Sequence, residues 1–491
     1  MNELLNKLGL DYLLVNCTNK YLTEYPELSE NARYKLTGFS GSTGDALITS
    51  DGIYLFVDGR YHIQADLEAK PEVNVVKLSI GQSQDEEIKK IVDKNKTLGI
   101  VSKKVSQARL EKFDGYKIKL LDADPINDFT ESHSAVPQKA FEPVEYAPSA
   151  SFISNLEEVS YLTGLRDFSK DNTSKIWSKL FIEGGKRILF NDDKECDKFL
   201  SEYEGTLIAD KSSINAHDYS LIKNPVHRQS EVKLMKSVKS EVELKAYQEA
   251  FDRTDMAIHS IREFIEENDN LSEYDIAEKL REGYIRFGAK SLSFNSIVAI
   301  NQNSAQAHYA KSSKDVILRE GDLVLIDSGA YYESGLATDI TRVFVKGKPS
   351  NFQKKVYTMV LKAFLNCFFL FNRKVSGFEI DTHAHNILDN AIDGFKFNHG
   401  LGHGIGINVH EAPPNLSQNE IAKVELSDGM CFTIEPGLYN SEFFGVRLEN
   451  SCYRKDGKTC SFVKMGYEGK LIDYDLLTEQ EKIWLSNFEI L

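Results

Sequence analysis

The segment from residue 398 to residue 411 is the feature that most restricts how this chain can fold. It reads Asn-His-Gly-Leu-Gly-His-Gly-Ile-Gly-Ile-Asn-Val-His-Glu, with glycine at every even position from 400 to 406. Repeated glycine disfavours a long helix and allows a ligand or a neighbouring strand to approach closely. In an extended segment alternate residues share a face, so we expect His399 and His403 to point the same way. Taken alone, the segment is equally compatible with a glycine-rich loop whose histidines are only surface groups.

Two aspartates lie in apolar surroundings upstream of this segment. The apolar residues 323–326 lead into Asp327, and a second, β-branched run carries Asp339. The turn residues 333–335 separate the two runs, which predicts a hairpin that brings the two carboxylates side by side. Adjacent carboxylates in an apolar site repel one another, so one of them takes up a proton unless a cation is bound.

Two glutamates lie in similar surroundings downstream. The apolar residues 431–434 lead to Glu435 in a Pro-Gly turn, and residues 445–450 are predicted to form a strand with Arg447 and Glu449 on one face. Each acid alone is most often an ordinary carboxylate at the end of a strand, because charged groups are mostly solvated. Four such acids between residues 327 and 449, together with the histidine cluster, favour one common site.

The charges of these acids favour a metal centre over a simple acid–base pair. Asp327, Asp339, Glu435 and Glu449 carry four negative charges, which two divalent cations would balance, and a bridging hydroxide would complete the site. Oxygen-rich ligation with a single imidazole suits Mn²⁺ or Co²⁺ better than a thiolate-type zinc site. Paired metals can activate water, polarise a carbonyl and orient a substrate.

These residues resemble the M24, or pita-bread, metallopeptidases, and are most similar to the three-domain, cytosolic group of X-prolyl aminopeptidases. The resemblance rests on the following residues: His399-Gly-Leu-Gly-His403, His410, Asp327, Asp339, Glu435-Pro-Gly and Arg447-Leu-Glu449. Weaker matches at residues 36–44, 56–61, 154–166 and 307–310 extend the resemblance over nearly the whole chain.

The resemblance implies an α/β (α+β) protein with a C-terminal pita-bread catalytic domain preceded by two creatinase-N-like α/β domains. We predict an N-terminal domain at residues 1–130, a smaller second domain at 131–228 and the catalytic domain at 229–491. A chain of 491 residues is too long for one core. The alternation of apolar runs and helical segments before residue 130 agrees with an α/β arrangement, and the proline-bearing residues 136–148 suit a linker.

The resemblance also implies a role for each site residue. Two metal ions, most often Mn²⁺ with Co²⁺ or Zn²⁺ as alternatives, would be held by Asp327, Asp339, His403, Glu435 and Glu449. In this arrangement Asp339 and Glu449 bridge the ions, Asp327 binds one ion, and His403 and Glu435 bind the other. Catalytic roles would fall to His308, His399 and His410, which line the substrate pocket, to Glu435 as proton shuttle, and to Arg447, which orients the carboxylates.

The implied reaction is hydrolysis of the bond between a free N-terminal residue and a proline at the second position, by a hydroxide that bridges two divalent metals. A prolidase that accepts only X-Pro dipeptides is the nearest alternative. The interval of twelve from Asp327 to Asp339 is one longer than in most relatives, and the spacing of His403 and His410 is more typical of the bacterial enzymes. Dipeptides and longer peptides therefore both stay open as substrates.

A non-catalytic pita-bread binding protein is the alternative from another functional class. It predicts missing metal ligands, whereas all five ligand positions are filled in this sequence. The resemblance also implies a homodimer.

Composition restricts the classes of partner that the protein is expected to bind and the cellular compartment in which it is expected. The net charge of −15 argues against a nucleic-acid partner, because phosphates would be repelled. The six cysteines are scattered without a C-x-x-C pair, and residues 1–7 do not resemble a secretory signal, so we expect a cytoplasmic protein. The apolar residues 359–371 are too few to span a membrane and are predicted to form a helix buried against a sheet.

A second long helix is predicted between residues 230 and 267, which contain neither glycine nor proline. Apolar residues recur in it at spacings of three to four, which favours one amphipathic face. The predicted face consists of Met235, Val238, Val242, Ala246 and Ala250.

Overall fold

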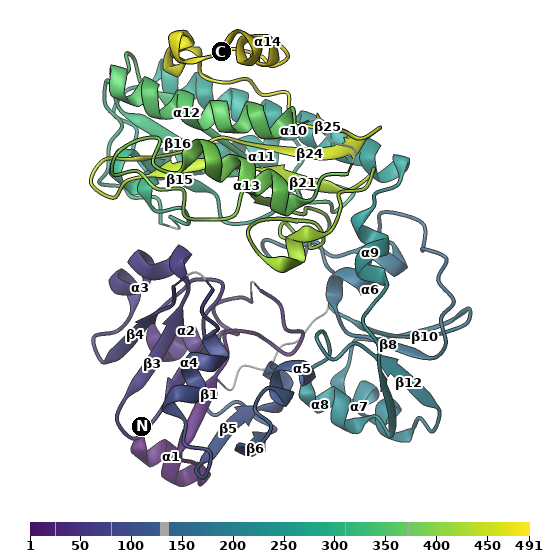
Figure 1. Ribbon diagram of the computed structural model, residues 1–491. Helices are drawn as coiled ribbons and strands as arrows, with labels where there is room; N and C mark the ends of the chain where they lie inside the picture. Colours follow the sequence, from purple (N-terminus) through teal and green to yellow (C-terminus); the bar gives the residue numbers. More distant parts are fainter. Residues whose placement is uncertain (25, 80, 128–136, 310, 371–373) are drawn as a thin grey trace. The chain divides into compact units, whose positions relative to one another are not determined.

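The computed structural model describes residues 1–24, 26–79, 81–127, 137–309, 311–370 and 374–491. The chain divides into two compact units (Figure 1). The first unit consists of Met1–Val136, Pro143–Thr163 and Ile176–Glu231, and the second of Pro137–Glu142, Gly164–Lys175 and Val232–Leu491. The predicted boundary between residues 130 and 131 lies outside the described residues, and the three predicted domain ranges remain a prediction.

The first unit contains two mixed sheets. The first sheet has the order β4-β3-β2-β1-β5-β6, formed by Val73–Lys77, Ile53–Val57, Ala46–Ile48, Tyr12–Val15, Thr97–Val101 and Lys117–Leu121. Side chains alternate along β1 and pack into two apolar clusters on opposite faces of the sheet. Leu14 lies in one cluster, and Leu13 and Val15 lie in the other. Its helices are α1 (Asn2–Leu8), α2 (Ala32–Thr37), α3 (His62–Glu68), α4 (Gln84–Ile91) and α5 (Gln107–Glu111).

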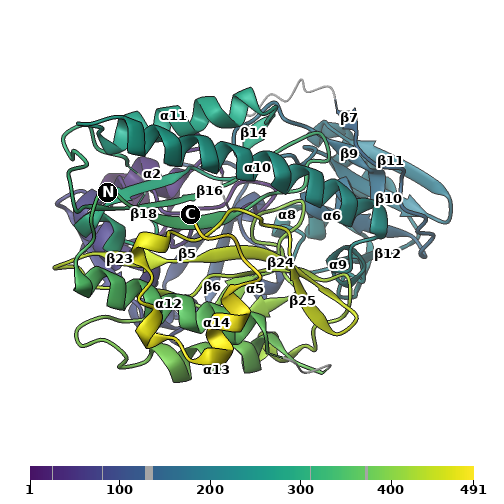
Figure 2. The ribbon, with the colours of Figure 1, turned by 90° about the horizontal axis from the view of Figure 1, so that it is seen from above.

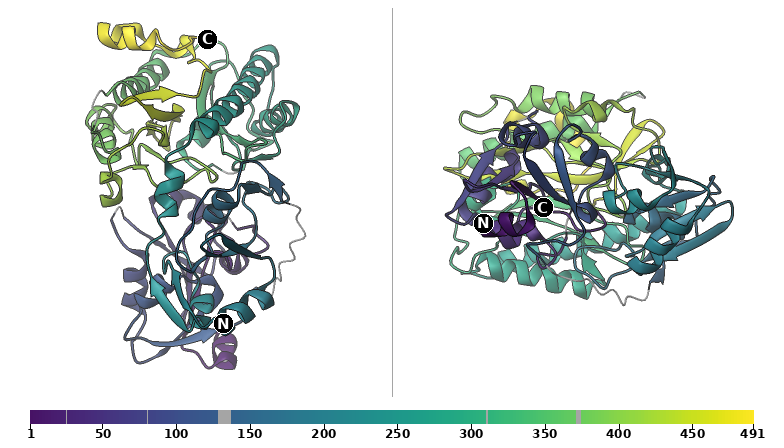
Figure 3. Two further views of the ribbon diagram at one scale, coloured as in Figure 1. Left: turned by 90° about the vertical axis from the view of Figure 1, so that its right-hand side faces the viewer. Right: turned by 90° about the horizontal axis from the view of Figure 1, so that it is seen from below.

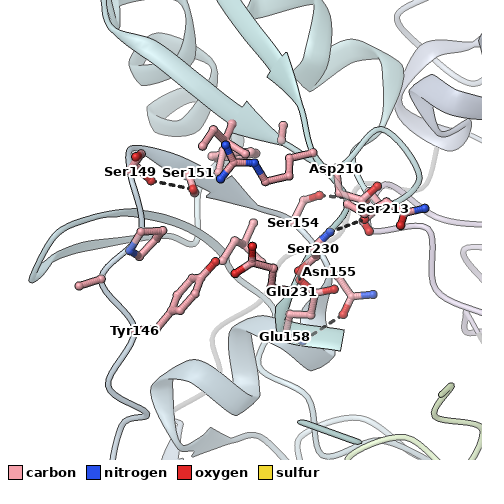
Figure 4. Close-up of a pocket in the computed structure, with 18 residues that line it drawn as sticks. Tyr146, Ser149, Ser151, Ser154, Asn155, Glu158, Asp210, Ser213, Ser230 and Glu231 are labelled. Carbon is pink, nitrogen blue, oxygen red and sulfur yellow. Dashed lines mark hydrogen bonds between the residues drawn. The ribbon is translucent and has the colours of Figure 1, made fainter. Parts of the chain in front are cut away.

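The second sheet of this unit has the order β11-β10-β8-β12-β13, formed by Lys186–Phe190, Lys179–Glu183, Ser151–Ile153, Thr206–Ala209 and Asn224–His227. Its helices are α6 (Leu156–Thr163), α7 (Asp193–Glu202) and α8 (Ala216–Leu221). A cavity of about 260 Å³ is lined by β8, the start of α6 and the segment after β13, with Tyr146, Glu158 and Arg228 among its residues (Figure 4). None of the predicted site residues lines this cavity.

The second unit is built on an antiparallel sheet with the order β15-β16-β18-β24-β21, which β25 extends beside β24. These strands are β15 (Ile297–Ile300), β16 (Leu323–Ser328), β18 (Ile340–Val345), β24 (Glu449–Lys455), β21 (Cys431–Ile434) and β25 (Lys458–Ser461). Two helix pairs cover its two faces: α10 (Glu241–Glu267) with α11 (Glu273–Arg286), and α12 (Asn351–Phe368) with α13 (Gly377–Leu388) (Figures 1–3). Each of these four helices starts at a serine whose side chain forms a reciprocal capping box.

The alternation of residues in β16 positions the site. Leu323 and Leu325 pack with α12 and α13 in the largest core, which also contains Val343 and Phe364. Because side chains alternate along a strand, Asp327 continues the row of Leu323 and Leu325. The carboxylate therefore lies where the buried core row ends.

The prediction for residues 230–267 is wrong in two respects. The segment is divided into α9 (Val232–Ser237) and α10, which starts anew after Ser240 caps its first turn. Val238 and Val242, placed on the buried face by the prediction, are 42% and 68% exposed. The buried face of α10 is instead formed by Tyr247, Ala250, Phe251, Thr254, Asp255, Ala257, Ile258, Ile261 and Ile265.

The apolar segment 359–371 is helical and buried as far as Phe368, where α12 ends. Phe371 lies outside the described residues. In the part of the chain that the structure describes, no helix is both long and apolar enough to cross a membrane.

Candidate metal centre

Three neighbouring strands place three of the acids on one face of the sheet. Asp327 of β16 lies opposite Thr341 of β18, and Thr341 lies opposite Glu449 at the start of β24. Asp339 precedes β18 and stands two residues before Thr341, so it shares this face. The predicted pairing of the two aspartates across antiparallel strands is therefore present, with Asp339 diagonal to Asp327.

The histidine segment brings His403 to the same face. Only Gly402–His403 of this segment forms a strand, β19, which pairs with β20 (Asn415–Leu416). The backbone N–H of Glu435, directly after β21, donates to Leu401 O at 2.8 Å. As a result, His403 Nε2 lies 3.6 Å from Asp339 Oδ2 and 3.7 Å from Glu435 Oε1. Asp339, His403 and Glu449 offer ligand atoms that all lie within 4.8 Å of one another.

The glycines of this segment are needed for close packing. A Cβ on Gly402 would overlap the Thr433 carbonyl oxygen, and one on Gly404 would overlap the Glu411 carbonyl oxygen. The backbone of the segment thus lies directly against β21 and against its own return, which fixes the position of His403.

We expect Gly402→Ala to lower kcat/KM by about 100-fold, because displacing His403 by about 1 Å disturbs the site. Steady-state kinetics on the metal-loaded enzyme measures this effect. Gly185→Ala is the matched control, since a Cβ at Gly185 meets no atom within 4 Å. Equal activity of the two variants would contradict the assigned role of the close packing.

Arg447 is the positive charge that connects the acids. Its Nη2 donates to Asp327 Oδ2 at 2.5 Å, and its Nε lies 3.9 Å from Glu435 Oε2. Its Nη1 donates to Tyr439 Oη at 2.8 Å and its Nε donates to Thr341 Oγ1 at 3.2 Å. A buried guanidinium in this position fixes the orientation of the Asp327 carboxylate.

The strand predicted for residues 445–450 is interrupted at Leu448. Arg447 ends β23 (Gly445–Arg447), which pairs with β22 (Gly437–Tyr439), whereas Glu449 begins β24 of the central sheet. The two side chains therefore reach the site from different sheets rather than from one strand face.

The acids lack enough positive charge to remain ionised together. Burial, followed by repulsion from Glu449 and Asp327, raises the pKa of Asp339 well above its usual range. Burial and Glu449 do the same to the pKa of Glu435. Burial and Asp327 raise the pKa of Glu449 to about 8. Each shift reports a carboxylate in need of a counter-charge.

Buried oxygens without a donor show where that counter-charge fits. Asp327 Oδ1, Asp339 Oδ1 and Glu449 Oε1 are buried and accept no hydrogen bond from any described residue. The other oxygens of two of these acids are held, by Arg447 on Asp327 and by Thr341 Oγ1 at 2.7 Å on Glu449. Several inward-facing carboxylate oxygens with one imidazole form a donor set suited to hard or borderline divalent cations.

The remaining predicted histidines lie at different places around this set. The ring of His410 lies 4.4 Å from the ring of His403, between centroids. His399 Nε2 lies 2.8 Å from the hydroxyl of Tyr439, which also accepts from Arg447. His308 is half-buried in a turn, and the carbonyl of the preceding Ala307 accepts from Arg447 Nη2 at 3.3 Å. The structure thus brings His410 and His399 beside the set and the backbone before His308 next to Arg447.

Glu411 holds the far end of the histidine segment. Its carboxylate is bound by Lys239 Nζ at 2.8 Å and Lys236 Nζ at 3.2 Å, and it accepts from Ile407 N–H at 2.8 Å. Burial acts to raise its pKa, but the two lysines hold the pKa of Glu411 at about 2. We call Glu411, Lys236 and Lys239 the lysine clamp.

Comparisons with known proteins agree with this geometry. Residues 245–455 match the model of metallopeptidase family M24, and residues 1–128 match that of the creatinase/prolidase N-terminal domain. The chain contains an M24 metallopeptidase domain. The M24 match contains every predicted metal ligand from Asp327 to Glu449.

Relatives of this M24 metallopeptidase align along nearly their full length. Xaa-Pro aminopeptidase 1 of Dictyostelium discoideum is 28% identical, with 98% of this chain and 89% of the relative covered. A probable Xaa-Pro aminopeptidase P of Podospora anserina is also 28% identical, with coverage of 99% and 84%. The crystal structure of X-prolyl aminopeptidase from Caenorhabditis elegans superposes with a TM-score of 0.85 at 21% identity, covering 97% of this chain and 90% of that chain. The predicted fold class, a pita-bread domain preceded by creatinase-like α/β structure, is confirmed.

Proposed function

We propose that this M24 metallopeptidase is an aminopeptidase that removes an N-terminal residue from peptides with proline at the second position. The observation that supports this proposal is the cluster of Asp339, His403 and Glu449, whose ligand atoms lie within 4.8 Å of one another. One buried oxygen of each of the two carboxylates has no hydrogen-bond donor among the described residues. The names of the aligned relatives suggest the substrate class: Xaa-Pro aminopeptidase 1 and a probable Xaa-Pro aminopeptidase P align with 98% and 99% of this chain.

We assign two divalent cations to this site, held by Asp327, Asp339, His403, Glu435 and Glu449. Mn²⁺ suits the oxygen-rich donor set, and Co²⁺ or Zn²⁺ would also bind. When bound, such a metal pair supplies Lewis acidity for the scissile carbonyl and a lowered pKa for an attacking water. Asp339 and Glu449 lie between Asp327 and His403 in the arrangement of the strands, so both would contribute ligand oxygens to the centre of the site.

The protein groups then have separate tasks. Glu435 accepts the proton of the attacking water at its carboxylate and returns it to the proline nitrogen as the peptide bond breaks. His410 and His399 line the pocket and donate toward the carbonyl oxygen and the leaving group, and His308 borders the same pocket. Arg447 is a positioning residue, because it holds Asp327 through its hydrogen bond rather than contacting substrate.

Peptides of increasing length test this proposal. The Mn²⁺-loaded full-length protein is expected to release alanine from Ala-Pro-Ala and to leave Ala-Ala-Ala intact. Cleavage of Ala-Pro but not of Ala-Pro-Ala would make the protein a prolidase instead. Failure to cleave any of the three with Mn²⁺, Co²⁺ or Zn²⁺ would favour the non-catalytic binding protein.

We further propose a cytoplasmic homodimer. The related Caenorhabditis elegans enzyme is described as cytosolic, and the six cysteines of this chain are all free thiols. Light scattering of the purified protein measures the mass: a value near twice 55.5 kDa supports the dimer, and a value near 55.5 kDa excludes it.

A further inference from the structure

A second group of possible metal ligands lies in the first unit. Asp197 of α7 and His217 and Asp218 of α8 each offer one ligand atom, and these atoms all lie within 4.8 Å of one another. None of the three belongs to the proposed peptidase site. No local sequence motif connects these three residues, because β12 lies between the two helices along the chain.

The spacing of the first two ligands suits a small divalent cation. His217 Nε2 lies 3.2 Å from Asp197 Oδ2. Two ligands at about 2.0–2.1 Å from a tetrahedral Zn²⁺ are themselves about 3.3 Å apart. The observed separation is therefore the edge length that such an ion needs.

Asp218 presents an oxygen that no described protein group uses. The residue is fully buried, at 0% exposure. Its Oδ2 accepts from Lys179 Nζ at 2.5 Å and from Asn215 Nδ2 at 3.2 Å. Its Oδ1 is buried without a hydrogen-bond donor among the described residues, and so is Asp197 Oδ1. Buried acceptors of this kind call for an unseen water or ion.

The local charge leaves room for a cation. Asp193, the nearby acid at the start of α7, is already paired with Lys20 at 3.1 Å and Lys103 at 3.3 Å. Lys179 neutralises one of the two remaining carboxylates, so Asp197 and Asp218 together keep one net negative charge beside the imidazole of His217. We propose that Asp197, His217 and Asp218 form a separate binding site for a borderline divalent cation of the Zn²⁺ type.

A plain hydrogen bond between His217 and Asp197 is the simpler alternative. It accounts for the 3.2 Å contact but leaves the two Oδ1 atoms without a partner. It also predicts that removing His217 changes no metal stoichiometry. The two hypotheses therefore predict different metal stoichiometries, which can be measured directly.

The test counts zinc in the metal-stripped, full-length protein after equilibration with a Zn²⁺ buffer of fixed free concentration. His217→Ala and Asp197→Asn are the chosen variants, because these side chains are 18% and 32% exposed, whereas that of Asp218 is fully buried. Asp218→Asn is unsuitable, since it would leave buried Lys179 without its counter-charge. Each variant is expected to bind one equivalent of zinc less than the unaltered protein.

His385→Ala is the matched control. His385 Nδ1 also lies 3.1 Å from an aspartate, Asp389, and its Nε2 lies 3.7 Å from a second one, Asp381, but these residues do not form a compact ligand set. Equal zinc content in all four proteins, or an equal loss in the control, would overturn the proposal. If His217→Ala fails to fold by circular dichroism, Asp197→Asn alone decides. Because the count is a difference between proteins that share the peptidase site, it is independent of the proposed activity.

Discussion

Replacement of Glu435 by glutamine is expected to lower kcat/KM for Ala-Pro-Ala by about 10³-fold, within the range for loss of a general base. Glutamine keeps the shape of the side chain but neither accepts the water proton nor carries the charge that binds a cation. Glu435 reaches the site because β21 ends beside it and its backbone N–H donates to the Leu401 carbonyl oxygen. Steady-state kinetics at saturating Mn²⁺ and metal analysis of the same samples measure the two effects separately.

Glu420→Gln serves as the control for this substitution. Glu420 lies in the same unit, and its carboxylate is largely exposed and paired with Lys423. The Glu420→Gln substitution makes the same chemical change away from the site, so the activity of this variant should equal that of the unaltered enzyme. Activity of Glu435→Gln within tenfold of that control would remove Glu435 from the mechanism.

Removal of the metal is expected to reduce peptide hydrolysis to the background rate, a loss of at least about 10³-fold. Dialysis against a chelator followed by addition of Mn²⁺, Co²⁺ or Zn²⁺ should restore it, in an order that identifies the preferred ion. Activity that survives complete removal, verified by metal analysis, would exclude the proposed mechanism.

The metal-free protein should also become less stable as pH rises. Glu449 has a pKa of about 8 in the folded chain against an ordinary value of 4.5, so between these pH values the folded state keeps a proton that the unfolded state has released. The free energy of unfolding therefore falls with increasing pH across this window, by a few kcal/mol. Bound cations replace the protons and remove this dependence.

Thermal unfolding at pH 5, 6.5 and 8 measures that difference. The gain in Tm on adding metal should increase from pH 5 to pH 8. A gain that is constant over this range would show that the buried carboxylates are not protonated in the metal-free fold.

The positions of the acids could be read from the sequence because each follows an apolar run. Such a run predicts a buried strand, and the residue after it lies at the strand's end, as Asp327 and Glu435 do. The position of Thr341 beside the acids could have been predicted in the same way, since Thr341 follows Asp339 by two residues and lies on the same face of the strand. Tyr439, which contacts both His399 and Arg447, carries no local pattern that would reveal this role.

The predictions for residues 445–450 and 230–267 differ from the structure, and these differences have physical causes as well. The residues 445–450 alternate without interruption, but the chain passes from one sheet to another at Leu448, and strand partners are not encoded locally. In the segment 230–267 the pattern Ser240-x-x-Glu243 was a capping signal that outweighed the apolar spacing on either side. The lysine clamp joins residues 172 positions apart, a contact that no periodicity reveals.

The lysine clamp determines where the second unit can be cut. The family match begins at residue 245, whereas Lys236 and Lys239 precede it. A fragment trimmed to the match would retain Glu411 at 1% exposure but lose both of its ammonium partners. The abandoned carboxylate would take up a proton or draw the histidine segment toward water. The shortest autonomous peptidase unit should therefore start no later than α9, at Val232.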